Sequence, residues 1–230
     1  MVGGFSELDV AEVRARYPEL ELRPDGALEG AVNVEAEYEG RRIVDRFFVK
    51  ITASNPHSIR TPALYEIGGR TKGIGSKYRL RDLRSLHCNR DGSACVCVKQ
   101  VEKQKFPPGS SLLVYVEELA IPYLYGLSRY DQDGKWPWGD YSHGSLGLLE
   151  YHADSLEGQS ATDIAETINT IKQDHADWKI YRKQIRNPSA KRPCPCGSGK
   201  PFGRCHTLAW RGTKRICAEI VRFNLKHLLT

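Results

Sequence analysis

The sequence feature that most constrains the fold is a short run of metal-binding residue types near the C-terminus. Cys194 and Cys196 precede Cys205 and His206, so three thiols and one imidazole lie within 13 residues. This is the ligand number of a closed tetrahedral Zn²⁺ site. Glycines between the cysteines allow the backbone to double back and bring the four side chains together. We expect a structural zinc ion that supplies most of the folding energy of so short a segment.

Two other interpretations of this run are weaker. Gly-Ser-Gly-Lys at residues 197–200 is part of the phosphate-binding loop pattern, but that motif requires glycine where Cys194 stands and Ser or Thr where Pro201 stands. A disulfide pair is disfavoured in a reducing compartment. Because four protein ligands leave no open position for substrate or water, the site is expected to support docking and not catalysis.

The run from Cys194 to His206 resembles the SEC-C motif, a zinc module named after the C-terminus of the secretion ATPase SecA. The resemblance covers about 13 residues and includes Gly-Ser-Gly-Lys, the aromatic Phe202 and the Cys-His ending. It agrees with the zinc ligand set that the residue types indicate by themselves.

The charge of the chain is distributed unevenly. Residues 1–155 carry 20 Lys and Arg against 22 Asp and Glu, whereas residues 156–230 carry 14 against 6. The stretch from Lys179 to Arg215 holds 11 basic residues and no acidic ones. Such a stretch favours an acidic protein surface or a nucleic acid as partner, and a merely solvated basic face is an equally good interpretation.

No part of the sequence is expected to span a membrane. The most apolar stretch, residues 112–127, is broken by Glu117, Glu118 and Pro122 and falls short of the ~20 apolar residues that a span requires. The first residues lack the basic and apolar regions of a secretory signal. We therefore expect a cytoplasmic protein whose seven cysteines stay reduced.

A second group of cysteines lies in the middle of the chain: Cys88, Cys95 and Cys97. An Asp-Gly turn at residues 91–92 precedes Cys95, which suits a reachable, partly ionised nucleophile better than Cys97 between two valines. Asn89 lies just upstream, and its side chain can donate a hydrogen bond to a developing oxyanion. For an isolated cysteine, buried structural filler is the more common interpretation.

His87-x-Asn89 followed by Gly-Ser-x-Cys95 resembles the active-site signature of ubiquitin-conjugating enzymes, in which His-Pro-Asn precedes Gly-x-x-Cys. The expected order of elements is also similar: an N-terminal helix, a β-meander, the His-x-Asn segment, the cysteine, and then a helix that begins near residues 107–110. The resemblance covers about residues 6–155. It departs from the family where Cys88 replaces the proline, in the shorter interval from Asn to Cys, and in the lack of the usual pair of C-terminal helices.

The resemblance implies a mechanism for individual residues. The Cys95 thiolate attacks an activated C-terminal carbonyl and holds it as a thioester, and an amine then attacks and leaves an isopeptide bond. Asn89 stabilises the oxyanion or shapes the active-site loop, and His87 holds that loop together. Asp140 and His143 orient or deprotonate the amine, or else they structure their own loop.

The same resemblance implies partners. Residues 136–151 are similar to divergent bacterial members of the family, which carry Trp-Pro and His-Gly there. Such members are encoded in antiphage (CBASS-type) operons, where the donor is the C-terminus of a nucleotide cyclase of the CD-NTase type. The sequence shows no adenylating domain, so we expect a separate activating enzyme or a donor that arrives activated. Nucleic acid is the less favoured partner, and no membrane partner is expected.

The sequence therefore predicts an α+β protein in three parts. Residues 1–155 form a ubiquitin-conjugating-like domain with an antiparallel β-meander and flanking helices, residues 156–190 form a helix and linker, and residues 191–230 form the SEC-C zinc module with a closing helix. Periodicity and breaker residues predict these elements: a helix capped by Asp9, strands over 32–38, 42–51 and 63–67, a Gly-rich loop over 68–77, and helices over 111–127 (kinked at Pro122), 162–185 and 212–229.

Three functions compete at this point. The first is a ubiquitin-conjugating-like transferase with Cys95 as its nucleophile. The second is a non-catalytic zinc adaptor that keeps the fold and binds an acidic protein or a nucleic acid through its basic tail. The third is a cysteine hydrolase that uses Cys95 and His143.

Overall fold

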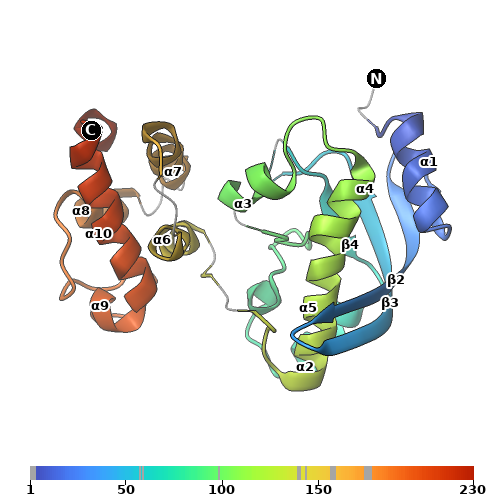
Figure 1. Ribbon diagram of the computed structural model, residues 1–230. Coiled ribbons are helices and arrows are strands. Elements are labelled where there is room, and N and C mark those ends of the chain that lie inside the picture. The colour runs from blue at the N-terminus through green and yellow to red at the C-terminus, as the bar shows by residue number, and fades with distance from the viewer. Residues whose placement is uncertain are drawn as a thin grey trace. The chain divides into compact units, whose positions relative to one another are not determined.

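The chain divides into two compact units, Met1–Gly139 and Asp140–Thr230. The structure, a computed structural model, describes residues 4–56, 58, 60–97, 99–138, 141–142, 144–155, 159–173 and 178–230. The described part of the N-terminal unit is α+β, and that of the C-terminal unit consists of helices together with the Cys/His segment (residues 193–206) (Figure 1). Helix α6 (Ser145–Asp154), which the sequence grouped with residues 1–155, belongs to the C-terminal unit.

The N-terminal unit contains an antiparallel sheet. Its described strands are β1 (Leu20–Leu22), β2 (Leu28–Tyr38), β3 (Arg41–Thr52) and β4 (Ala63–Glu66), and they lie in chain order. The longest pairing joins β2 to β3 and begins with Leu28 opposite Ile51. Glu39 and Gly40 connect these strands with φ of 51° and 73°, as a two-residue hairpin turn requires. The predicted antiparallel meander is confirmed, with β1 as an additional short strand.

A helical column crosses the sheet and closes the N-terminal core. It consists of α4 (Leu112–Tyr115), a π-helical segment (Val116–Ala120) and α5 (Ile121–Asp133) (Figure 1). Tyr115 and Leu127 of the column are fully buried in one core with Phe47 of β3. The sequence predicted a kinked helix here. The π-helical segment ends at Ala120, two residues before Pro122, which has no N–H to donate, and its wider turn accommodates the missing hydrogen bond.

The first helix begins earlier than predicted. Helix α1 (Glu7–Arg16) is capped by Ser6, whose Oγ accepts the Asp9 N–H at 3.1 Å. Asp9 is therefore inside the first turn. Its Oδ1 instead accepts the N–H of Leu112 at 2.9 Å, so this carboxylate joins α1 to the start of α4.

The predicted Gly-rich loop over residues 68–77 is wrong, because this stretch forms helix α2 (Arg70–Lys77). The Glu66 carboxylate accepts the Thr71 N–H at 2.8 Å and so satisfies one of the unpaired donors at the helix start. Arg70 pairs with Asp45 of β3 at 3.0 Å and with Asp131 of α5 at 2.9 Å. These tertiary contacts override the low helix propensity of the two internal glycines.

Two short helical segments flank the second group of cysteines. A 3-10 turn (Leu83–Leu86) precedes it, and helix α3 (Lys99–Lys105) follows it.

In the C-terminal unit, helix α10 packs against each neighbouring helix: α6, α7 (Ala161–Gln173), α8 (Trp178–Arg186) and α9 (Phe202–Cys205). It spans Thr207–Arg222 and is followed by a 3-10 turn (Lys226–Leu229). The predicted closing helix therefore begins earlier, directly after His206, and ends earlier. A Cβ at Gly212 of α10 would lie 1.6 Å from the Leu149 carbonyl oxygen of α6, so only glycine permits this close approach.

The predicted helix over residues 162–185 consists of two described helices, α7 and α8. The spacing of Ile164, Ile168, Ile171 and Ile180 predicts a narrow apolar stripe on one helix. The first three are fully buried, whereas Ile180 is 44% exposed and its neighbour Tyr181 is buried instead. The prediction fails at Ile180 because α8 is a separate helix with its own register.

Among the described residues, no helix has both the length and the apolar composition needed to cross a lipid bilayer.

Candidate metal centre

The Cys/His segment folds back on itself before α10 begins. Pro193 and Pro201 form an isolated antiparallel bridge, and the Cys194 N–H donates to the Lys200 carbonyl at 2.8 Å. Inside this loop, the Gly197 N–H donates to the Cys194 carbonyl at 3.1 Å. Gly197 has a φ of 76°, a conformation that glycine adopts without strain. The local fold therefore returns the chain to its start and brings both ends of the segment together.

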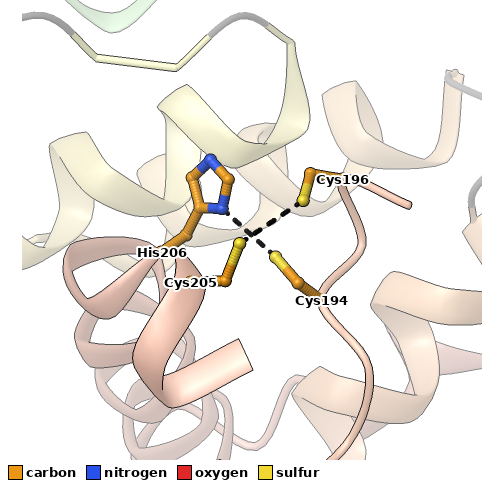
Figure 2. A group of neighbouring side chains, drawn as sticks. All are labelled: Cys194, Cys196, Cys205 and His206. Carbon is orange, nitrogen blue, oxygen red and sulfur yellow. Dashed lines mark hydrogen bonds between the residues drawn. The ribbon is translucent and has the colours of Figure 1, made fainter. Parts of the chain in front are cut away.

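The four predicted ligands converge at one point. Their ligand atoms all lie within 4.8 Å of one another. Cys194 Sγ is 3.2 Å from His206 Nδ1, and Cys196 Sγ is 3.6 Å from Cys205 Sγ (Figure 2). A tetrahedral Zn²⁺ with Zn–S bonds of about 2.3 Å separates its sulfur ligands by about 3.8 Å. The cluster thus has the ligand types and the approximate spacing that a tetrahedral metal ion requires.

Electrostatics within the cluster also suit a cation. Burial raises the pKa of the Cys194 thiol. Burial also acts to raise the pKa of Cys196, but hydrogen bonds from Ser198, Cys194 and Cys205 outweigh it and lower that pKa to about 7. A bound divalent cation favours the thiolate form of each ligand and compensates the charges that would otherwise repel one another.

Sequence reasoning missed Ser198. Its Oγ lies 3.1 Å from Cys196 Sγ and 3.2 Å from Cys205 Sγ, within hydrogen-bond distance of both. Groups in this position orient metal ligands and tune their basicity. The signal available in the sequence is a hydroxyl residue between two glycines inside the ligand run.

The Cys/His segment is anchored in a hydrophobic core. Phe202 is fully buried, and its ring lies 5.9 Å from that of Trp210 on α10. It belongs to one buried cluster with Leu149 of α6, Ile164 of α7 and Ile216 of α10. Apolar burial therefore contributes to the stability of a segment whose folding energy was expected to come mostly from the metal.

The second candidate site is the Cys95 loop, defined as residues 87–97. The Cys95 N–H donates to the His87 carbonyl at 2.7 Å, so the loop closes on itself. The Asn89 side chain donates to Ser93 Oγ at 3.0 Å, and Ser93 Oγ in turn contacts Asp91 at 2.7 Å. In this conformation the Asn89 amide shapes the loop, which is one of the two roles expected for it.

His87 lies at a bend in this loop. It has a φ of 50°, and its ring packs edge-on against Trp136 with centroids 4.7 Å apart. The Trp136 indole N–H donates to the Ser85 carbonyl at 2.9 Å. These contacts agree with a loop-holding role for His87.

Cys95 is half-buried, and its thiol is protonated at neutral pH. Burial and, to a lesser extent, the charge of Glu102 raise the pKa of Cys95 to about 11. The same two causes, with Cys95 as a third, raise the pKa of Cys97 still further. Of these two thiols Cys95 ionises more readily, but a reaction at its sulfur requires a group that removes the proton.

Asp140 and His143 lie outside the described residues. Their predicted roles in orienting or deprotonating an amine stay predictions, and so does the hydrolase pairing of Cys95 with His143.

Comparison with known proteins bears on the metal cluster alone. Residues 193–206 match the SEC-C motif. A stretch of 62 residues is 34% identical to the protein translocase subunit SecA of Caulobacter vibrioides, and it covers 26% of this chain and 7% of SecA. No solved structure matches the chain. The predicted SEC-C motif is thus confirmed, and the similarity concerns a small part of both proteins.

The cluster predicts metal binding at one site. We expect elemental analysis of the purified protein to give about one metal ion per chain, as four ligands around one point imply. Cys194→Ser should lower this content by at least about tenfold. Cys217→Ser is the matched control, because Cys217 is a half-buried thiol of α10 outside the cluster. Equal metal content in both variants would contradict the assignment of the ligands.

Proposed function

We propose that this protein is a ubiquitin-conjugating-like transferase that carries an acyl group as a thioester on Cys95. The hydrogen bond that closes the Cys95 loop on His87 carries the proposal, because it holds the thiol next to the His-x-Asn segment. The arrangement of the N-terminal unit supports it: a helix, an antiparallel meander, the cysteine loop and a helical column follow one another in the order that the resemblance implies.

The proposed reaction has two transfers. The Cys95 sulfur attacks the C-terminal carbonyl carbon of an activated donor protein, a C–S bond forms, and the activating group leaves with a proton. A primary amine then attacks the same carbon, the C–S bond breaks, and an isopeptide bond and a free Cys95 thiol result. His87 and Asn89 hold the loop in which the thiol lies.

The partners in this proposal follow from the resemblance. The donor is a protein with an activated C-terminus, for which a nucleotide cyclase of an antiphage operon is the candidate. A separate enzyme activates its carboxylate. The acceptor is a primary amine, usually that of a lysine side chain.

In the same proposal the C-terminal cluster holds a structural zinc ion. Three thiols and one imidazole favour Zn²⁺ over oxygen-preferring cations. Cys194, Cys196, Cys205 and His206 would hold it, and with four protein ligands the ion would cross-link the Cys/His segment without an open position for chemistry. The described part of the C-terminal unit then serves to dock a partner.

The transferase proposal predicts a thioester at Cys95. We expect a peptide with a C-terminal thioester to form an adduct with the protein that hydroxylamine releases, that a phosphine reductant leaves intact, and that mass spectrometry locates on Cys95. Cys95→Ala should abolish the adduct, because no sulfur remains at position 95 to be acylated. Cys97→Ala is the matched control and should form it normally. An adduct that persists in Cys95→Ala and disappears in Cys97→Ala would overturn the assignment.

A second candidate function, a non-catalytic adaptor for an anionic partner, is favoured by helix α8. The side chains of Lys179, Arg182, Lys183 and Arg186 are spaced so that they share one face of the helix, opposite its buried residues Tyr181 and Ile185. Within the described ranges, none of these four cations forms an ion pair. Unneutralised charge on one face favours association with an acidic protein surface or a nucleic acid.

The adaptor candidate predicts salt-sensitive binding. A single-stranded oligonucleotide and an acidic peptide should each be titrated at several salt concentrations. For the oligonucleotide, the double substitution Lys183→Glu and Arg186→Glu should weaken binding and reduce the slope of log affinity against log salt by about 1.4, because two phosphate contacts are lost and each contributes about 0.7 on a single strand. Lys226→Glu, outside α8, serves as the control. A binding curve that does not change with salt would exclude this function.

A further inference from the structure

The residues of the metal cluster are exposed to solvent unequally. Cys194 is buried, with 3% of its surface exposed, whereas Cys196 is exposed and Cys205 is half-buried. The fold of the Cys/His segment causes this difference. Cys194 belongs to the same buried cluster as Phe202, while residues 196–200 form an exposed loop. Small solutes can therefore reach one part of the cluster, and the core covers the other part.

The sulfur atoms of the two less buried cysteines lie next to each other. Cys196 Sγ is 3.6 Å from Cys205 Sγ, a separation that suits two ligands of one metal ion (Figure 2). A disulfide bond is 2.05 Å long, so the two sulfurs need to approach each other by about 1.5 Å to form one. Gly197 and Gly199 follow Cys196 in the exposed loop, and glycine lets the backbone adjust at little cost. The geometry is therefore compatible with two metal-bound thiolates and with one disulfide.

The hydroxyl of Ser198 lies beside this pair of sulfurs. Its Oγ is 3.1 Å from Cys196 Sγ and 3.2 Å from Cys205 Sγ. A thiolate can only accept a hydrogen bond, so the hydroxyl donates its one hydrogen to one sulfur at a time. Such a hydrogen bond lowers the basicity of a thiolate, and the nucleophilicity of sulfur falls with its basicity. Ser198 therefore makes the exposed pair less reactive.

We propose that Cys196 and Cys205 form an oxidation site, which hydrogen peroxide converts to a disulfide with release of the metal ion, and that Ser198 slows this reaction. Once both sulfurs are in a disulfide, Cys194 and His206 are what remains of the ligand set. Structural zinc sites are almost always four-coordinate, so two ligands do not retain the ion. The inference uses the C-terminal cluster alone and is independent of the proposed transferase function.

The oxidation takes place in two steps. The Cys196 thiolate, the more exposed of the two, attacks one oxygen of hydrogen peroxide. The O–O bond breaks, and a sulfenic acid and a hydroxide ion form. The Cys205 thiolate then attacks the Cys196 sulfur, the S–O bond breaks, and a second hydroxide ion leaves. The two sulfurs together lose two electrons, which hydrogen peroxide gains.

The test uses the full chain loaded with one zinc ion per molecule. Hydrogen peroxide is added in excess, a zinc-responsive dye reports the released ion, and mass spectrometry of an unreduced digest maps the disulfides. We expect one ion to be released per chain and a disulfide between Cys196 and Cys205. Reduction in the presence of Zn²⁺ should restore binding, because a disulfide is reversible. Cys217→Ser, which removes a half-buried thiol outside the cluster, should release the ion at the wild-type rate.

Ser198→Ala tests the role of the hydroxyl. This variant keeps all four ligands, so it should hold one zinc ion in the absence of peroxide. With peroxide it should release the ion severalfold faster than the wild type, because its thiolates are the stronger nucleophiles. Thr207→Ala is the matched control and should match the wild type. It removes a hydroxyl close in sequence to the ligands, but that hydroxyl donates to the Gly203 carbonyl at 3.1 Å.

Each part of the proposal can fail separately. The oxidation site is overturned if the ion stays bound in excess peroxide, or if the mapped disulfide contains Cys194. Release that leaves Cys196 as a sulfinic or sulfonic acid, with no disulfide, also overturns it. If Ser198→Ala cannot be loaded with zinc, or releases the ion no faster than the wild type, the role of Ser198 is overturned while the oxidation site stands. A wild-type chain that binds no metal ion would end both claims.

Discussion

Three thiols and one imidazole lie within 4.8 Å of one another in the C-terminal unit, and its architecture depends on what neutralises them. The three cysteines would repel one another as thiolates. Burial adds a second penalty, because it disfavours the charged form of Cys194 and raises the pKa of that thiol. A bound cation would remove both penalties and would cross-link the two ends of the Cys/His segment. Because His206 is directly followed by α10, such a cross-link would also hold the start of this helix, the longest of those described in the unit.

The position of α10 determines the rest of the C-terminal packing. Phe202 and Trp210 join the Cys/His segment to the helical core, and Gly212 allows α10 to approach the Leu149 carbonyl of α6. If α10 began at a different residue, the Phe202–Trp210 contact and the close approach of Gly212 to Leu149 would both be lost. The N-terminal unit has no comparable dependence on a ligand in its described part, because Tyr115, Leu127 and Phe47 form an apolar core that the sheet and the helical column close by themselves.

The sequence predicted best what depends on neighbours along the chain. The metal ligands, the β2–β3 hairpin and the buried stripe of α7 all follow from local spacing, and the structure agrees. Sequence-based prediction failed where contacts between residues far apart in the chain determine the local structure. Helix α2 forms around two glycines because Asp45 and Asp131 hold Arg70, and neither acid is close to it in sequence. The burial of Glu102 could not be predicted for the same reason, since its hydroxyl partners Ser58 and Thr61 lie some 40 residues upstream.

X-ray absorption at the metal edge of the purified protein measures the ligand set directly. We expect zinc bound by about three sulfur atoms at about 2.3 Å and one nitrogen at about 2.0 Å, with no open coordination position. Coordination dominated by oxygen, or a sulfur count below two, would contradict the assignment of Cys194, Cys196, Cys205 and His206 as a closed site.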